Sequence, residues 1–156
     1  MLTYDAVIFD LDGTLTDSRP GIFACAEYAL KKMGLPVPDE ATLQRFLGPP
    51  LAESFMKYCG MTEDQAVGAT ALYRERYIPI GWKENSVYPR IRALLAALKE
   101  RGAYLAVATG KPEHISMEVL RYFDLLQYFD AVAGPAPGEM HADKGTLIRR
   151  VLPEGK

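Results

Sequence analysis

The chain has 156 residues, of which 49% are hydrophobic and 24% are charged, and its formal net charge is −2. This composition lies near the globular average and excludes a disordered or low-complexity protein, and the length suits about one domain. The small negative charge argues against nucleic acid or an anionic membrane as a partner, because both require an excess of basic residues.

The cysteine pattern and the apolar runs bear on the compartment. Cys25 and Cys59 do not form a CxxC pair, so neither a zinc site nor a disulfide framework is indicated, and two free thiols suit a reducing environment. No apolar run reaches the roughly 18 residues of a membrane-spanning helix, and Asp5 stands where a signal peptide would be basic. We therefore expect a cytoplasmic protein without a membrane partner.

Apolar runs and helical stripes alternate through the first and last parts of the chain. Residues 4–9 favour a buried, central parallel strand, because their apolar side chains would point to both faces of a sheet. Residues 103–108 predict a second strand, and residues 130–133 predict a weaker third. Helices are expected between Pro89 and Gly102, after Pro112, and from about Asp143. This alternation predicts an α/β fold with a parallel sheet.

Residues 18–85 interrupt the alternation, because they contain helical signals alone. Thr62 and Gln65 fit a capping box at the start of the longest of these helices. An all-helical block of this length is too long for a simple crossover between two strands. We therefore predict an α/β core formed by residues 1–17 and 86–156, with a helical subdomain inserted at 18–85.

The most informative motif, directly after the first expected strand, is Phe9-Asp10-Leu11-Asp12-Gly13-Thr14-Leu15-Thr16-Asp17-Ser18. Two carboxylates two residues apart at this point face the crevice where open α/β sheets bind ligands. One carboxylate can attack or hold a cation while the other moves a proton. Asp and Gly are also common turn residues, so an ordinary exit from the strand is the alternative interpretation. The apolar strand before the pair and the Gly-Thr-Leu-Thr-Asp-Ser sequence after it favour the catalytic interpretation.

This motif is accompanied by the helical insertion, the strand ending Val107-Ala108-Thr109 and the downstream Lys144. In these features the sequence resembles the haloacid-dehalogenase-like (HAD) superfamily and its phosphoglycolate-phosphatase-like branch. The resemblance implies a Rossmann-like parallel sheet in which the inserted helices form a cap. It also implies that Asp10 is the nucleophile and forms an aspartyl-phosphate. Asp12 would protonate the leaving group and then activate water, and Lys144 would neutralise charge. Mg²⁺ would be held by Asp10 and by the backbone carbonyl of Asp12.

The segment Thr109-Gly110-Lys111-Pro112 follows the second expected strand. A hydroxyl at a strand end and free N–H groups at a helix start suit an anion, so we expect Thr109, Gly110 and Lys111 to bind the substrate phosphate. The same residues also suit a plain link between a strand and a helix. Lys111 and Lys144 are both expected near the crevice, and the sequence leaves open which of them neutralises the phosphate.

Two further features concern the insertion and the end of the chain. Gly48-Pro49-Pro50 is a rigid connector between helices, and the resemblance makes Gly48 a candidate substrate-binding residue. The acidic motif that follows the lysine in this family, and that completes the Mg²⁺ shell, is not found before Lys156. We therefore expect a shortened chain in which residues 4–9 form an exposed sheet edge, and we expect self-association through that edge or completion by another subunit.

The resemblance implies a Mg²⁺-dependent phosphatase that hydrolyses a small phosphorylated metabolite, with phosphoglycolate as the first substrate expected. A 5'-nucleotidase of the same superfamily is a close alternative, because the two groups share these motifs. A second carboxylate at Asp12 favours phosphate esters, since the dehalogenase branch lacks it. A non-catalytic phosphate-binding protein of the same fold remains an alternative, favoured by the absent acidic motif, and a mutase is a third.

Overall fold

The computed structural model describes residues 4–139 and 142–154. These residues divide into two compact units. The core unit combines the described residues of the segments 1–17 and 86–156, and the helical unit consists of residues 18–85. The chain leaves the core unit after β2 (Thr16–Asp17) and returns to it at β3 (Ser86–Val87), and these two short strands pair antiparallel.

The core unit is built on a sheet of three parallel strands in the order β1-β4-β5. These strands are β1 (Ala6–Phe9), β4 (Tyr104–Ala108) and β5 (Ala131–Ala133). Ala6 pairs with Tyr104, and Ala106 pairs with Ala131. All three strands lie within the ranges predicted from the apolar runs, so the expected α/β fold with a parallel sheet is confirmed.

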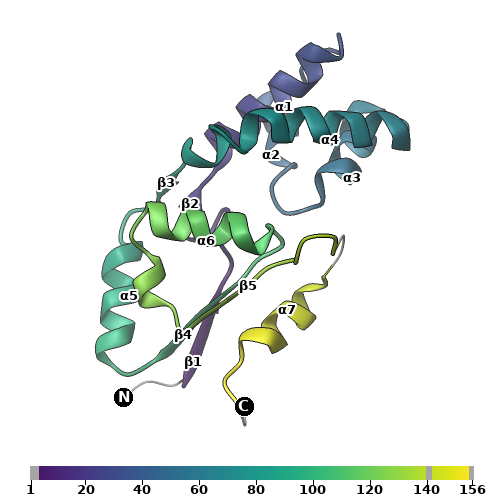
Figure 1. The fold of residues 1–156 in the computed structure, drawn as a ribbon. Coiled ribbons are helices and arrows are strands. Elements are labelled where there is room, and N and C mark those ends of the chain that lie inside the picture. The colour runs from purple at the N-terminus through teal and green to yellow at the C-terminus, as the bar shows by residue number, and fades with distance from the viewer. Residues whose placement is uncertain (1–3, 140–141, 155–156) are drawn as a thin grey trace. The chain divides into compact units, whose positions relative to one another are not determined.

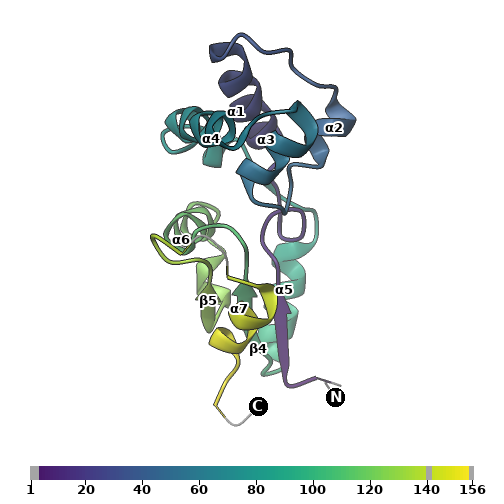
Figure 2. The same cartoon turned by 90° about the vertical axis from the view of Figure 1, so that its right-hand side faces the viewer.

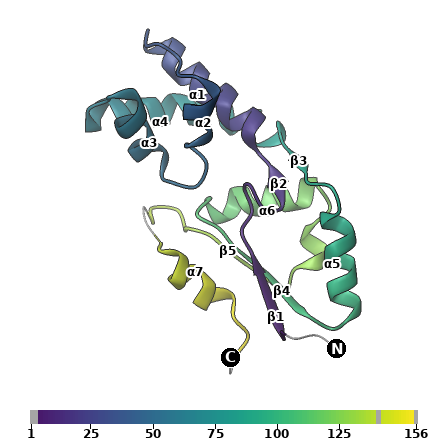
Figure 3. The same cartoon turned by 180° about the vertical axis from the view of Figure 1, so that it is seen from behind.

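Helices cover both faces of this sheet (Figure 1). They are α5 (Ile91–Glu100), α6 (Glu113–Tyr122) and α7 (Lys144–Val151), with a short 3-10 turn η2 at Leu126–Tyr128. Leu147 and Val151 of α7 pack on one face of the sheet, against Ala106 and Ala108 of β4. Figure 2 views the core unit from the α7 side, and Figure 3 shows α5 on the opposite side of the strands. The predicted helices of the core are confirmed.

β1 is an edge strand, and the prediction of a central, fully buried strand at residues 4–9 is wrong. Each residue of β1 is half-buried, whereas Leu105 and Val107 in the middle strand β4 are fully buried. The reason is topological, because β1 pairs with β4 on one side and with no other strand among the described residues. The alternative expectation, an apolar sheet edge, is the one that the structure confirms.

The helical unit consists of α1 (Arg19–Lys32), α2 (Glu40–Gln44), α3 (Leu51–Cys59), α4 (Glu63–Tyr77) and the 3-10 turn η1 (Gly81–Lys83). α4 packs against both α1 and α3, as Figure 3 shows. The predicted capping box is present, since the hydroxyl of Thr62 accepts a hydrogen bond from the Gln65 amide and the Gln65 side chain accepts one from the Thr62 amide. Gly21 lets α1 approach η1 closely, because a Cβ there would lie 2.1 Å from the carbonyl oxygen of Gly81.

None of the helices in the described parts of the chain is both long and apolar enough to cross a membrane.

The edge position of β1 generates a prediction about association. An apolar edge strand offers unpaired N–H and C=O groups to other strands, so we expect the chain to form dimers or larger species through β1. Sedimentation equilibrium over a range of concentrations measures this, and the expected result is a mass that rises with concentration. A chain that stays monomeric at all concentrations and unfolds cooperatively would contradict the prediction.

Candidate active site

The two carboxylates of the motif lie in a tight turn directly after β1. The N–H groups of Thr14 and Leu15 both donate to the carbonyl of Leu11, and Leu11 and Leu15 are fully buried beneath the turn. Gly13 has a φ of +79°, a conformation that side-chain-bearing residues rarely adopt. The buried leucines and the glycine together fix the backbone that carries the carboxylates.

Asp10 forms an ion pair with Lys144, the first residue of α7. Its Oδ1 lies 3.2 Å from Nζ of Lys144, and both side chains are about half-exposed. Oδ1 also accepts a hydrogen bond of 2.7 Å from the N–H of Leu11. Nζ of Lys144 donates at 2.6 Å to the carbonyl of Ala108, the last residue of β4. Lys144 therefore connects the ends of the two adjacent strands β1 and β4.

Asp12 forms a second ion pair, with Lys111. Its Oδ2 lies 2.9 Å from Nζ of Lys111, and the side chains are 18% and 9% exposed. The other carboxylate oxygen, Oδ1, is buried and has no hydrogen-bond partner among the described residues. The structure thus brings both expected carboxylates and both expected lysines together, and it assigns each lysine to a different carboxylate.

Thr109 lies at the carboxyl end of β4, where it is 2% exposed. Its N–H donates to the carbonyl of Ala133, and its Oγ1 accepts a hydrogen bond of 3.1 Å from the N–H of Lys111. The hydroxyl proton of Thr109 is not used by that bond and can be donated to an anion. Gly110, which follows, is exposed. This geometry is compatible with the expected phosphate-binding role of the segment.

Gly134 and Ser116 position this segment, and neither was predicted from the sequence. A Cβ on Gly134 would lie 2.4 Å from the carbonyl oxygen of Lys111 and 3.0 Å from the backbone of Glu113. The hydroxyl of Ser116 is buried and lies within hydrogen-bond distance of the carbonyls of Lys111 and Pro112. Gly134 could have been found from the sequence, because it is a glycine directly after a predicted strand. No local sequence signal marks Ser116.

The start of α7 places Lys144 at the site. Asp143 caps this helix and accepts hydrogen bonds from the hydroxyl and the N–H of Thr146, which lower the pKa of its carboxyl. The segment before α7 is held through Glu139, whose carboxylate binds both terminal nitrogens of Arg150. Arg150 and the N–H of Ala136 lower the pKa of Glu139 to about 2. These contacts attach Glu139 to α7 and cap the start of the helix that carries Lys144.

Comparison with known proteins gives the family of this site. A family model described as haloacid dehalogenase-like hydrolase matches residues 7–154. The chain belongs to this family. The resemblance that the motifs carry is thereby confirmed.

The chain is similar to several named members of the haloacid dehalogenase-like hydrolases. It is 42% identical over 151 residues to a 5'-nucleotidase of Pseudomonas aeruginosa, covering 97% of this chain and 68% of that protein. It is 39% identical to tyrosine-protein kinase PtkA of Mycobacterium tuberculosis, covering 94% and 50% of the two chains. It is 33% identical to a phosphoglycolate phosphatase of Cupriavidus necator, covering 91% and 64%.

Solved structures agree with this assignment. The crystal structure of a protein described as a predicted phosphatase from Clostridium acetobutylicum matches with a TM-score of 0.86 and 44% identity, over 94% of this chain and 68% of that one. The chain spans between 50% and 68% of the length of the proteins compared. The family is one of hydrolases, and several relatives are named as phosphatases. Together these findings support the assignment of this chain as a phosphatase.

HAD phosphatases generally use Mg²⁺, and such an ion needs oxygen ligands at the site. Within residues 4–139 and 142–154, no three His, Cys, Asp or Glu side chains gather into a metal cluster. Mg²⁺ is commonly bound through one or two carboxylates together with water and substrate phosphate. The exposed carboxylate of Asp10 and the backbone carbonyl of Asp12 are hard oxygen ligands of that kind. The donor set therefore fits a magnesium ion that keeps part of its water shell.

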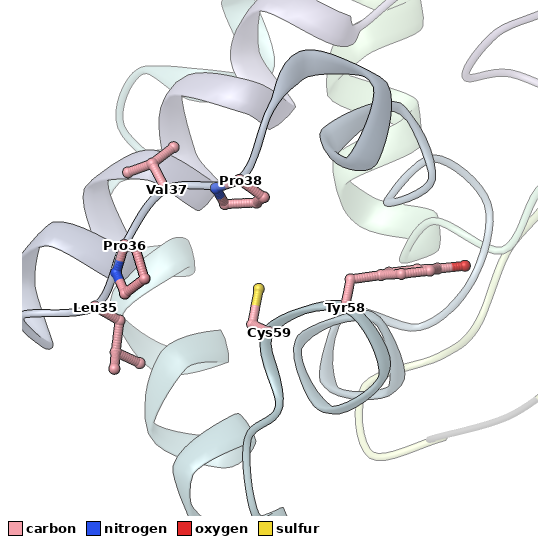
Figure 4. Close-up of a pocket in the computed structure, with 6 residues that line it drawn as sticks. All are labelled: Leu35, Pro36, Val37, Pro38, Tyr58 and Cys59. Atoms are coloured by element: carbon pink, nitrogen blue, oxygen red, sulfur yellow. The ribbon is translucent and has the colours of Figure 1, made fainter.

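The helical unit contains Gly48 and an apolar pocket. Gly48 lies between α2 and α3 with a φ of +103°, and its expected role in substrate binding stays a prediction. The pocket has a volume of about 210 Å³ and is lined by Leu35, Pro36, Val37, Pro38, Tyr58 and Cys59 (Figure 4). Burial raises the pKa of the Cys59 thiol, which favours its neutral form. The six lining residues carry no cationic side chain, which is the usual partner of a phosphate.

The close approach of Gly134 to the Lys111 segment generates a prediction. Gly134→Ala forces the backbone at Lys111 or Glu113 to shift, and we expect the free energy of unfolding of the core unit to fall by about 1–3 kcal/mol. Urea unfolding measures this. Gly68→Ala in α4 is the control, because a Cβ there meets nothing within 4 Å, and it should raise stability by up to about 1 kcal/mol. Unchanged stability of Gly134→Ala would contradict the account.

Proposed function

We propose that this protein is a Mg²⁺-dependent phosphatase of a small phosphate monoester, with Asp10 as the nucleophile. The observation that carries the proposal is the pairing of Asp10 with Lys144 at the carboxyl ends of β1 and β4. A carboxylate attacks an anionic phosphate poorly unless positive charge lies beside it. The half-exposed ammonium of Lys144 supplies that charge next to the attacking oxygen.

The reaction divides between the two carboxylates. An oxygen of Asp10 forms a bond to phosphorus while the bond from phosphorus to the ester oxygen breaks, and protonated Asp12 gives its proton to that leaving oxygen. Water then attacks the phosphorus of the aspartyl-phosphate, and Asp12 takes the proton of the water. Inorganic phosphate leaves, and the carboxylate of Asp10 is regenerated. The hydroxyl of Thr109 donates a hydrogen bond to a phosphoryl oxygen during both steps.

The carboxylate of Asp10 and the backbone carbonyl of Asp12 would hold Mg²⁺, which when bound supplies further positive charge to the phosphoryl oxygens. Lys144 provides the lysine charge that the phosphate requires, since Lys111 is engaged by Asp12. Gly110 contributes an exposed backbone to the phosphate site. A cytoplasmic location is supported by Cys25 and Cys59, neither of which forms a disulfide among the described residues.

The substrate class is a small phosphorylated metabolite. Phosphoglycolate is supported by the 33% identity to the phosphoglycolate phosphatase of Cupriavidus necator. A nucleoside 5'-monophosphate is the second candidate, and the 42% identity to the 5'-nucleotidase of Pseudomonas aeruginosa favours it. Both are monoesters of a primary alcohol, so both need a proton on the leaving oxygen, which is the role given to Asp12.

We expect Asp10→Asn to lower phosphate release by at least about 10³-fold, because the amide is not a nucleophile. Release of inorganic phosphate from phosphoglycolate, a nucleoside 5'-monophosphate and an aryl phosphate measures this. Removal of Mg²⁺ with a chelator should abolish release, and added Mg²⁺ should restore it.

Asp5→Asn is the matched control, because Asp5 is an exposed aspartate at the opposite end of β1. It should leave phosphate release unchanged. Equal activity of Asp10→Asn and Asp5→Asn would contradict the proposal. No release by a folded wild-type chain with Mg²⁺ would also contradict it and would favour a phosphate-binding protein without turnover.

A further inference from the structure

We propose that Lys111 is a positioning residue for the proton carrier Asp12, and that it does not bind the substrate phosphate. This inference rests on the proposed function. The observation behind it is the pairing of Nζ of Lys111 with Oδ2 of Asp12 at 2.9 Å, in a pair whose side chains are 9% and 18% exposed. A lysine that served the phosphate instead would have to leave this carboxylate.

The backbone of Lys111 is held at both of its polar groups. Its N–H donates to Oγ1 of Thr109, and its carbonyl lies 3.3 Å from the hydroxyl of the buried Ser116. Gly134 lies against the same carbonyl, where a Cβ would not fit. Lys111 therefore extends from a fixed point at the end of β4, and its ammonium reaches Asp12 in the adjacent turn.

Among the described residues, the hydrogen bond that the structure gives the carboxylate of Asp12 comes from Lys111. Oδ1 is buried without a hydrogen-bond partner among the described residues, so Oδ2 and its bond to Lys111 set the rotamer. A general acid must lie within hydrogen-bond reach of the leaving oxygen, so its orientation controls the rate of proton transfer. The ion pair supplies that orientation from a side chain that does not itself touch the reacting atoms.

The two lysines of the site accordingly have different tasks. Lys144 is 48% exposed and lies beside the attacking oxygen of Asp10, where its charge can reach a phosphate. Lys111 is nearly buried, and its ammonium lies 2.9 Å from Oδ2 of Asp12. Sequence alone left open which lysine neutralises the phosphate, and this division assigns that role to Lys144 under the proposal.

The test compares two leaving groups in the Lys111→Met variant, which keeps an unbranched side chain and removes the charge. kcat/KM reports the steps up to transfer of the phosphoryl group. A primary alkyl phosphate such as phosphoglycolate needs a proton on its leaving oxygen, whereas 4-nitrophenyl phosphate has a leaving group that departs without one. We expect kcat/KM to fall by about 10²–10⁴-fold for the alkyl phosphate and by less than about tenfold for the aryl phosphate.

Lys99→Met is the matched control, because Lys99 forms an ion pair with Asp130 in the same unit at 2.6 Å. It should leave the ratio of the two kcat/KM values unchanged. An equal fall for both substrates in Lys111→Met would overturn the inference, since a phosphate-binding or purely structural lysine affects both. Unchanged values for both substrates would also overturn it.

A double variant keeps the test decisive if Lys111→Met folds poorly. In Asp12→Asn the carboxylate charge is gone, so removing Lys111 no longer leaves an unpaired buried charge. If Lys111 acts through Asp12, Asp12→Asn/Lys111→Met should match Asp12→Asn in kcat/KM for the alkyl phosphate. A further loss of tenfold or more in the double variant would overturn the inference.

Crystal structures of the wild type and of Lys111→Met give a readout without turnover. The expected result is a changed rotamer at position 12 when Lys111 is replaced in the otherwise wild-type chain, with the pair of Asp10 and Lys144 retained. An unmoved Asp12 carboxylate would overturn the inference. A wild type that hydrolyses neither substrate would refute the proposed function. The crystal structures would still test whether Lys111 positions Asp12, so the two failures can be told apart.

Discussion

Two carboxylates placed two residues apart at the end of one strand repel each other, and the site depends on how that repulsion is balanced. Asp10 is balanced by Lys144 and Asp12 by Lys111, and each lysine comes from a segment far along the chain. The difference in exposure between the two pairs separates their chemistry. The half-exposed pair can admit a metal ion and a phosphate, whereas the nearly buried pair keeps one geometry.

The parallel sheet makes this balance possible because it brings the ends of β1, β4 and β5 to one edge. Lys144 reaches that edge because Leu147 and Val151 anchor α7 on β4 and β5. The hydroxyl of Tyr104 also donates to the carbonyl of Val151 at 2.7 Å, which ties the end of α7 to the start of β4. Gly134 lets the chain after β5 lie against the Lys111 segment. Packing far from the carboxylates therefore decides where the two ammonium groups lie.

The sequence predicts the strands and helices well, because apolar periodicity and caps such as Thr62 with Gln65 are local signals. It also predicts residues that the structure brings together, since Asp10, Asp12, Thr109, Lys111 and Lys144 all follow strands or begin helices. The pairing of the lysines is not predictable in this way, because it depends on side-chain reach across the sheet. The edge position of β1 and the tight contact at Gly134 are likewise set by which segments pair in space.

The central claim is that Asp10 carries the phosphoryl group, and trapping that intermediate tests it most directly. The protein is mixed with phosphorylated substrate and Mg²⁺, quenched in acid within one turnover, and reduced with borohydride, which converts an acyl phosphate to an alcohol. Peptide mapping by mass spectrometry then locates the product. The account predicts homoserine at position 10 in the wild type. A chain that turns over substrate without modification at position 10, or with modification at another carboxylate, would contradict it.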